Sequence, residues 1–171
     1  MNNYLISNAG YAVATYFLAV GDRHLENLLV KNNGDLFHLD FGFILGNNPK
    51  SKGDFWVPPI RINKHMVNGM GGQTSEEYKI FKQKTIDAFL YLRNYRQLFL
   101  NILLLMVNAS IPDLPFATYQ NVLNKMNRRF LPELSNEEAR AKFSTIIDDS
   151  VNAGIAEIFE LVHKFSIFMK T

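Results

Sequence analysis

Two short apolar runs enclose an Asn-Gly pair near the start of the chain, and this feature constrains the fold most. The runs are residues 28–31 and 36–39, and Asn33-Gly34 lies in the polar stretch between them. Asn-Gly between apolar runs is the strongest local signal for a β-hairpin, because a type I′ turn requires positive φ at both central residues. We therefore expect a hairpin whose two-residue loop is Asn33-Gly34.

This loop would bring two oxygen-bearing side chains together at the open end of the hairpin. With a two-residue loop, Leu28 faces Leu39, and one step further Asn27 faces Asp40. Directly opposed residues have Cβ atoms about 5 Å apart. An amide oxygen and a carboxylate oxygen at that separation can share Mg²⁺, which takes few protein groups and completes its shell with water and phosphate. The alternative for each residue alone is structural, with Asn27 capping a strand and Asp40 serving a turn.

Ionisable residues precede the first strand in the stretch GDRHLENLLV, residues 21–30. His24 can accept a proton near neutral pH, and Asp22 lies close by in the same loop. The spacing of Asp22 from Asn27, together with Asp40-Phe41-Gly42 after a strand, is typical of the catalytic loop and metal-binding aspartate of protein kinases. The order Asp-Arg-His, however, inverts the His-Arg-Asp of those enzymes.

Most of the chain outside the hairpin has helical patterns. Pro58, Pro59 and several glycines make regular structure unlikely over residues 43–62. The expected helices cover residues 3–19, Asn63 to near 69–72, the Thr74–Glu77 capping box to about Asn94, 95–108, 118–130, the Ser135–Glu138 capping box to about Asn152, and 155–169.

Composition excludes several classes of protein. The chain has 171 residues, no cysteine and a net charge of +2, so a disulfide framework is impossible and nucleic acid is not an expected partner. The longest uninterrupted apolar run, residues 102–107, is far shorter than the roughly 20 residues that span a bilayer. We expect a soluble chain that at most lies on a membrane surface.

The motif GDRHLENLLV followed by LFHLDFGFILG resembles the phosphatidylinositol 3-kinase and 4-kinase superfamily. The segments NKHMVNGMGG, FLYLRNYRQLFLNILLLMVNASIPDL and VHKFSIFMK are similar to class III phosphatidylinositol 3-kinases, and the likeness covers residues 3–170. The resemblance implies the mainly α C-terminal lobe of a protein-kinase-like fold, with a small β-hairpin. Its parts would be a catalytic loop at 21–27, an activation loop at about 40–62, a helical bundle at 63–153 and a membrane-facing helix at 155–170.

The resemblance also implies roles for individual residues. Asn27 and Asp40 would bind Mg²⁺ or Mn²⁺ and thereby ATP. His24 would be the general base or transition-state stabiliser toward the inositol 3-hydroxyl, with Asp22 orienting it or sharing the role, and the choice between them stays open. The cations of the activation loop that would face the lipid headgroup are Lys50, Lys52 and Arg61.

Two segments are candidates for contact with a membrane. Trp56 either enters the bilayer interface, where indole rings are favoured, or packs against the lobe. The last predicted helix has an apolar stripe and flanking lysines, so it either lies in the interface or docks on the bundle. Its expected membrane residues are Phe165, Phe168 and Met169.

The resemblance predicts a lipid kinase that phosphorylates phosphatidylinositol at the 3-position for endosomal sorting and autophagy. Its expected location is the cytoplasmic face of those membranes, with a protein-kinase-like regulatory subunit and adaptor subunits as partners. The phosphate-covering N-terminal lobe is expected outside this chain, so the chain alone should be inactive. The alternatives are a phosphatidylinositol 4-kinase and a non-catalytic lobe that binds a membrane or a partner.

Overall fold

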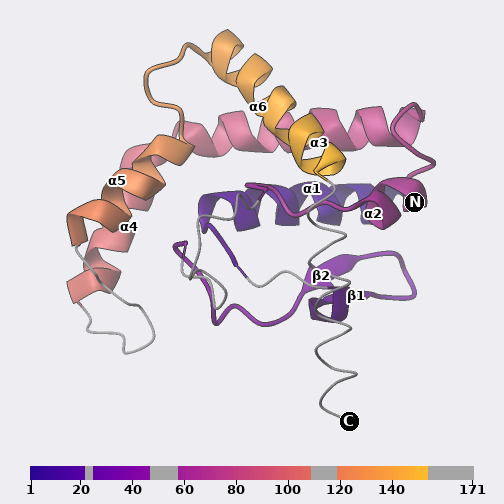
Figure 1. Cartoon of the computed structure of the whole chain (residues 1–171), viewed down its shortest axis with the longest axis horizontal. Helices are drawn as coiled ribbons and strands as arrows, with labels where there is room; N and C mark the ends of the chain where they lie inside the picture. The colour runs from indigo at the N-terminus through magenta and orange to yellow at the C-terminus, as the bar shows by residue number, and fades with distance from the viewer. Residues whose placement is uncertain (22–24, 47–57, 109–118, 154–171) are drawn as a thin grey trace.

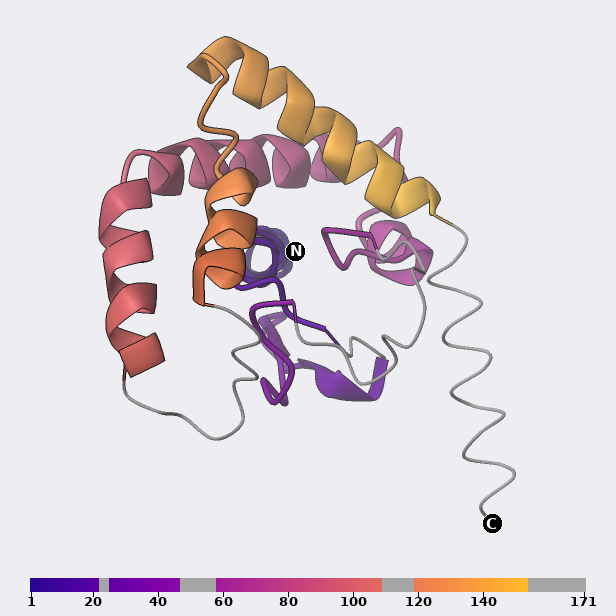
Figure 2. The ribbon, with the colours of Figure 1, turned by 60° about the vertical axis from the view of Figure 1, so that its left-hand side comes forward.

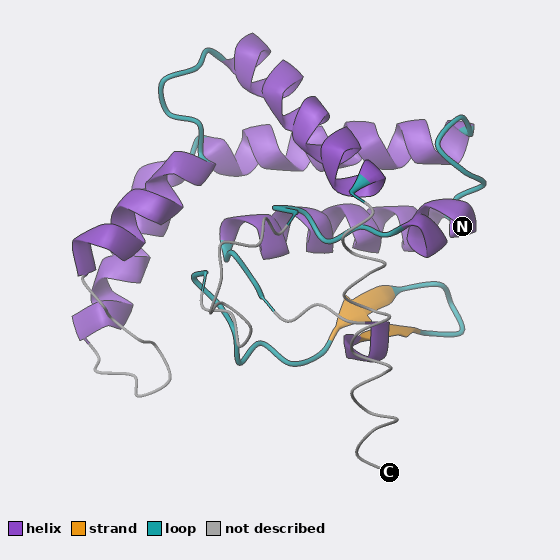
Figure 3. Cartoon of the chain, in the orientation of Figure 1, coloured by secondary structure: helices purple, strands orange, loops and turns teal. Residues whose placement is uncertain are grey.

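The fold is mainly helical with one small hairpin, as the sequence predicts (Figures 1 and 3). The computed structural model describes residues 1–21, 25–46, 58–108 and 119–153. Its elements in chain order are α1 (Asn2–Phe17), the 3₁₀ turn η1 (Leu25–Asn27), β1 (Leu28–Val30), β2 (Leu36–His38), α2 (Lys64–Gly69), α3 (Glu76–Arg93), α4 (Arg96–Asn108), α5 (Tyr119–Arg129) and α6 (Asn136–Asn152).

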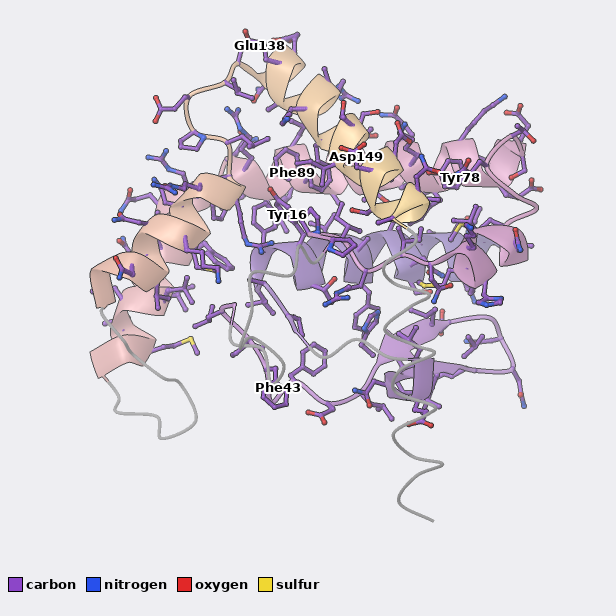
Figure 4. The ribbon with its side chains drawn as sticks, viewed as in Figure 1. Tyr16, Phe43, Tyr78, Phe89, Glu138 and Asp149 are labelled. Carbon is purple, nitrogen blue, oxygen red and sulfur yellow. The ribbon has the colours of Figure 1, made fainter. Side chains whose placement is uncertain are left out.

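Helix α1 is the centre of the fold, because α3 and the hairpin lie on different sides of it (Figure 1). Its buried residues recur at helical spacing and include Leu5, Ala9 and Val13. At its C-terminal end, Tyr16 joins an aromatic cluster in which the rings of Phe89 and Phe143 stack with centroids 3.9 Å apart. Tyr16 and Phe89 face each other between α1 and α3 in Figure 4. This cluster connects α1, α3 and α6 in the main core.

The first residues of the helices show which of the predicted capping residues are present. Asn63 caps α2 by accepting a hydrogen bond from the Met66 N–H, and Ser135 with Glu138 forms the predicted capping box of α6. The predicted Thr74–Glu77 box is wrong, because Ser75 is the N-cap of α3 and accepts from the Tyr78 N–H. The Ser75 hydroxyl also donates to the Met70 carbonyl at 2.6 Å, which ties the cap to the preceding turn.

Helices α4 and α5 form a pair that extends beyond the main core (Figure 2). Both agree with the predicted ranges 95–108 and 118–130 to within a residue. They enclose a second, smaller core, whose buried members are Ala19, Leu45, Leu103 and Met126. Phe99 packs against both cores, and its ring lies 5.3 Å, centroid to centroid, from that of Phe130 in the main core.

The described parts of the predicted loop 43–62 contain neither helix nor strand, as its prolines predict. The last predicted helix, residues 155–169, lies outside the described residues. No helix within the described ranges has the length and apolar character that crossing a bilayer requires.

Candidate active site

The hairpin is present, but its register differs from the predicted one by one residue. Leu28 lies opposite His38 instead of Leu39. One step further, the Leu39 N–H donates to the Asn27 carbonyl at 2.8 Å, so Asn27 lies opposite Leu39 instead of Asp40. The prediction of a cross-strand Asn27–Asp40 pair is therefore wrong, although both residues lie at the open end of the hairpin.

The turn explains this shift. The Gly34 N–H donates to the Lys31 carbonyl at 2.8 Å, and the Lys31 N–H donates to the Asp35 carbonyl at 2.9 Å. Three residues, 32–34, therefore form the loop, with Gly34 at φ +91° as in a type I turn followed by a bulge. Asn33 favours this geometry because its Oδ1 accepts from the Asp35 N–H and its amide donates to the Asp35 carboxylate.

Asp40 lies directly after the last cross-strand hydrogen bond and turns the chain away from β2. Its φ is +56°, a left-handed conformation that aspartate tolerates better than most residues. Its Oδ1 accepts a hydrogen bond from the Gly42 N–H at 2.9 Å. The side chain is exposed, and Oδ2 accepts no hydrogen bond from the described residues. Asp40 thus presents one carboxylate oxygen at the open end of the hairpin.

Asn27 ends the short turn η1 and is half-buried. Its amide oxygen and the Asp40 carboxylate are hard oxygen donors, the type that Mg²⁺ prefers. The described residues contain no group of three histidine, cysteine, aspartate or glutamate side chains that could bind a metal ion by themselves. This donor set suits a metal that takes most of its ligands from water and phosphate.

The hairpin register also reveals an apolar surface beside these donors, which the predicted register does not contain. Paired residues of a hairpin point to the same face and alternate along each strand, so Leu29 and Leu39 share the face of Asn27. Both leucines are exposed, at 44% and 41%. The alternation from Asn27 to Leu29 was visible in the sequence, but Leu39 joins this face only in the observed register.

The opposite face of the hairpin packs against α1. His38 is buried there, and its ring stacks on Tyr11 with centroids 4.9 Å apart. The Leu36 N–H donates to the Ser7 hydroxyl at 2.9 Å, which fastens β2 to α1. His38 is therefore part of the packing that positions the site.

Arg61 is the one predicted headgroup residue in the described range. It is half-buried between the buried residues Ile60 and Ile62, and its contacts show that it is not a free cation. The remaining predicted site residues lie outside the described ranges, and their roles stay predictions: Asp22, His24, Lys50, Lys52, Trp56, Phe165, Phe168 and Met169.

The largest resolved pKa shifts belong to the core instead of the hairpin. Burial raises the pKa of Tyr16 to about 12, although the nearby Arg129 opposes this shift. Burial, with the Asp148 carboxylate as a second cause, raises the pKa of Tyr78 to about 12. Figure 4 shows both tyrosines beside α1 and α3, away from the hairpin. These shifts reflect core packing and do not mark a further catalytic group.

Comparison with known proteins identifies the family. The family described as phosphatidylinositol 3- and 4-kinase matches residues 1–116. The phosphatidylinositol 3-kinase pik3 of Schizosaccharomyces pombe is 42% identical over 171 residues, which are 100% of this chain and 21% of the relative.

Two further relatives have similar names. The phosphatidylinositol 3-kinase VPS34 of Candida albicans is 39% identical over 99% of this chain and 16% of the relative. The phosphatidylinositol 3-kinase catalytic subunit type 3 of Caenorhabditis elegans is 41% identical over 96% of this chain and 18% of the relative. The chain thus spans at most 21% of the length of these relatives. The predicted resemblance is confirmed: the chain belongs to the phosphatidylinositol 3- and 4-kinase family.

Proposed function

We propose that this chain is the C-terminal lobe of a kinase that transfers the γ-phosphate of ATP to the 3-hydroxyl of phosphatidylinositol. The observation that carries the proposal is the similarity of 96–100% of the chain to three relatives that are all named phosphatidylinositol 3-kinase. The oxygen donors of Asn27 and Asp40 at the open end of the hairpin support it, because they suit metal-assisted phosphoryl transfer.

Asn27 and Asp40 would hold the metal ion in this proposal. When bound, Mg²⁺ neutralises negative charge on the phosphates of ATP. The contact between Asp40 Oδ1 and the Gly42 N–H limits the rotation of the carboxylate, so Oδ2 is already oriented before the nucleotide arrives. A preorganised ligand of this kind loses little further conformational freedom on binding.

In the same proposal, the apolar surface of Leu29 and Leu39 would contact the adenine base of ATP. It lies on the hairpin face that also carries Asn27, and both side chains are exposed. A flat, weakly polar adenine ring would cover these side chains and remove apolar surface from water. The hairpin would then contact both the base and the phosphates of one nucleotide.

The proton of the inositol 3-hydroxyl would pass to His24 or Asp22, which precede η1 in the sequence. A neutral imidazole can accept a proton near pH 7. The proposal also includes the surface of endosomal and autophagic membranes as the place of reaction, with regulatory and adaptor subunits as partners. These assignments come from the family resemblance.

The test uses a full-length kinase that carries this chain. Radiolabelled ATP and phosphatidylinositol vesicles are supplied, and the phosphoinositide isomers are separated by chromatography. The Asp40→Asn variant should lose activity by at least about 100-fold, as expected when a charge-stabilising group is removed. Asp149→Asn is the matched control, because Asp149 is exposed on α6 (Figure 4).

Two results would contradict the proposal. Near wild-type activity of the Asp40→Asn variant would exclude the metal-binding role. A 4-phosphorylated product would place the chain among the 4-kinases of the family, while leaving the role of the hairpin intact.

A further inference from the structure

The two chain segments that flank the candidate site are hydrogen-bonded to each other. One is residues 18–21, which follow α1 and precede Asp22 and His24 in the sequence, and the other is residues 43–46, which follow Asp40-Phe41-Gly42. The backbone bonds run from the Leu45 N–H to the Leu18 carbonyl at 2.7 Å, from the Gly46 N–H to the Ala19 carbonyl at 3.0 Å, and from the Gly21 N–H to the Phe43 carbonyl at 2.7 Å. A displacement of residues 43–46 would therefore also affect residues 18–21. We call these two hydrogen-bonded segments the junction.

This junction has an unusual backbone conformation. Ala19 and Leu45 are non-glycine residues at φ +47° and φ +57°, and Gly46 follows at φ +81°. Such residues are strained and persist where the surroundings hold them. Ala19 and Leu45 are both buried in the second core, against Leu103 of α4 and Met126 of α5. The α4–α5 pair thus supports the junction from outside the main core.

Helix α5 also contributes a polar contact to the junction. The Lys125 Nζ lies 3.4 Å from the Gly46 carbonyl oxygen, and this is its only hydrogen bond within the described residues. A Cβ added at Gly46 would lie 1.9 Å from that Nζ and 2.5 Å from Cε. Glycine at position 46 therefore allows both the positive φ and the close approach of the lysine.

Lys125 is exposed on α5, but its ammonium group is directed at the backbone of the junction and not at a carboxylate. Lys125 forms no ion pair with a carboxylate in the described part of the chain. Burial, together with the neighbouring Arg129, lowers its pKa. The Arg129 guanidinium group already has partners, since it donates a hydrogen bond to the Tyr16 carbonyl and lies over the Tyr16 ring. The chain thus keeps Lys125 near a second cation, with the Gly46 carbonyl as its hydrogen-bond acceptor.

We propose that Lys125 is a positioning residue for the lipid substrate, because its ammonium group holds Gly46 at the root of the predicted activation loop. The inference rests on the proposed function for the identity of the substrate. Loss of the contact should release residues 43–46 and weaken binding of the phosphatidylinositol headgroup. ATP binding should change little, because the hydrogen bond of the Lys125 ammonium group within the described residues goes to Gly46 and not to Asn27 or Asp40.

The kinetic test compares Lys125→Met with Arg128→Met in a full-length kinase that carries this chain. Arg128 is exposed on the same helix and its side chain makes no hydrogen bond within the described residues, so it controls for the loss of one positive charge. The Lys125→Met variant should raise the KM for phosphatidylinositol in vesicles by about 10-fold, with the KM for ATP nearly unchanged. An equal change in both KM values, or no change in either, would overturn the proposal.

A double-mutant cycle tests whether Gly46 is the partner. A side chain at residue 46 would displace the ammonium group, so Gly46→Ala should also raise the KM for phosphatidylinositol. Adding Lys125→Met to Gly46→Ala should then have little further effect, because the contact is already lost. Fully additive effects of the two substitutions would contradict a shared contact.

Amide hydrogen exchange tests the contact between Lys125 and Gly46 without an activity assay. In Lys125→Met, the amides of Leu45 and Gly46 should exchange faster than in wild type, while those of α1 remain protected. Unchanged exchange at both amides would overturn the positioning role. If faster exchange occurs but the wild-type kinase does not phosphorylate phosphatidylinositol, the contact stands and the proposed function fails.

Discussion

At the residue scale, the backbone of Asn33 and Gly34 decides which side chains meet at the open end of the hairpin. Gly34 adopts φ +91°, which both loops require, whereas Asn33 does not adopt the positive φ that the predicted two-residue loop also needs, so the loop has three residues. A Cβ at this position would meet only ordinary van der Waals neighbours, the nearest being the Tyr4 backbone nitrogen at 3.8 Å. The requirement for glycine is thus conformational and does not come from lack of space.

This leads to a prediction with opposite signs at two glycines. Gly34→Ala should destabilise the chain by about 1 kcal/mol, because alanine is strained at positive φ. Gly10→Ala should stabilise it by about 0.5–1 kcal/mol, because Gly10 is exposed within α1 and has no neighbour within 4 Å of the added Cβ. Urea unfolding monitored by circular dichroism measures both values. Equal shifts in the same direction would show that the backbone of Gly34 is not constrained.

The residues of the candidate site could be predicted more easily than their arrangement. Asn27 and Asp40 were identified from residue type and from the nearby turn, and both lie at the end of the hairpin. Their register could not be predicted, because Asn-Gly is compatible with more than one turn. The side-chain hydrogen bonds of Asn33 to Asp35, which accompany the longer loop, depend on the folded turn.

At the element scale, capping signals predicted helix ends well where only one candidate was present. Ser135 with Glu138 is such a case, and α6 begins at the next residue, Asn136. Thr74 and Ser75 are adjacent capping residues, so pattern alone could not choose between them. The contact of the Ser75 hydroxyl with the Met70 carbonyl, made by the turn before α3, favours serine.

The capping box of α6 predicts a pH-dependent stability. The Ser135 N–H donates to the Glu138 carboxylate at 2.8 Å, and this bond, followed by that with the Ser135 side chain, lowers the Glu138 pKa below its ordinary value of 4.5. A lowered folded-state pKa gives stability that is present above the unfolded pKa and is lost as pH falls through the folded pKa. Stability of the wild type should therefore decline as pH falls below about 5.

The comparison of Glu138→Gln with Glu137→Gln isolates this effect. Glutamine at position 138 can still accept the Ser135 hydrogen bond but does not titrate, so the decline between about pH 5 and pH 3 should become shallower. The Glu137 side chain makes no hydrogen bond within the described residues, and its substitution should leave the slope closer to that of wild type. Urea midpoints measured across this pH range provide the test. Parallel curves for wild type and Glu138→Gln would contradict it.

At the scale of the whole molecule, the main core stabilises the fold, and the second core supports the junction of residues 18–21 and 43–46. The main core joins α1, α3 and α6, whereas the second core joins α4 and α5 to residues 44–45. The helices of both cores could be predicted from their apolar periodicity. Their division into two cores could not, because it depends on long-range packing that brings Leu45 into one cluster with Leu103 and Met126.

This division predicts that a cavity in the second core acts locally. Leu103→Ala should speed amide exchange at Leu45 and Gly46 while α1 and α3 keep most of their protection, because the second core holds the junction. Phe143→Ala removes the ring that stacks on Phe89 and should lower global stability by about 3–5 kcal/mol, with faster exchange in both cores. Native-state hydrogen exchange at low urea concentrations distinguishes these outcomes. If Leu103→Ala reduced protection equally in both cores, the two would form one cooperative unit, and α5 could not position residues 43–46 independently of the main core.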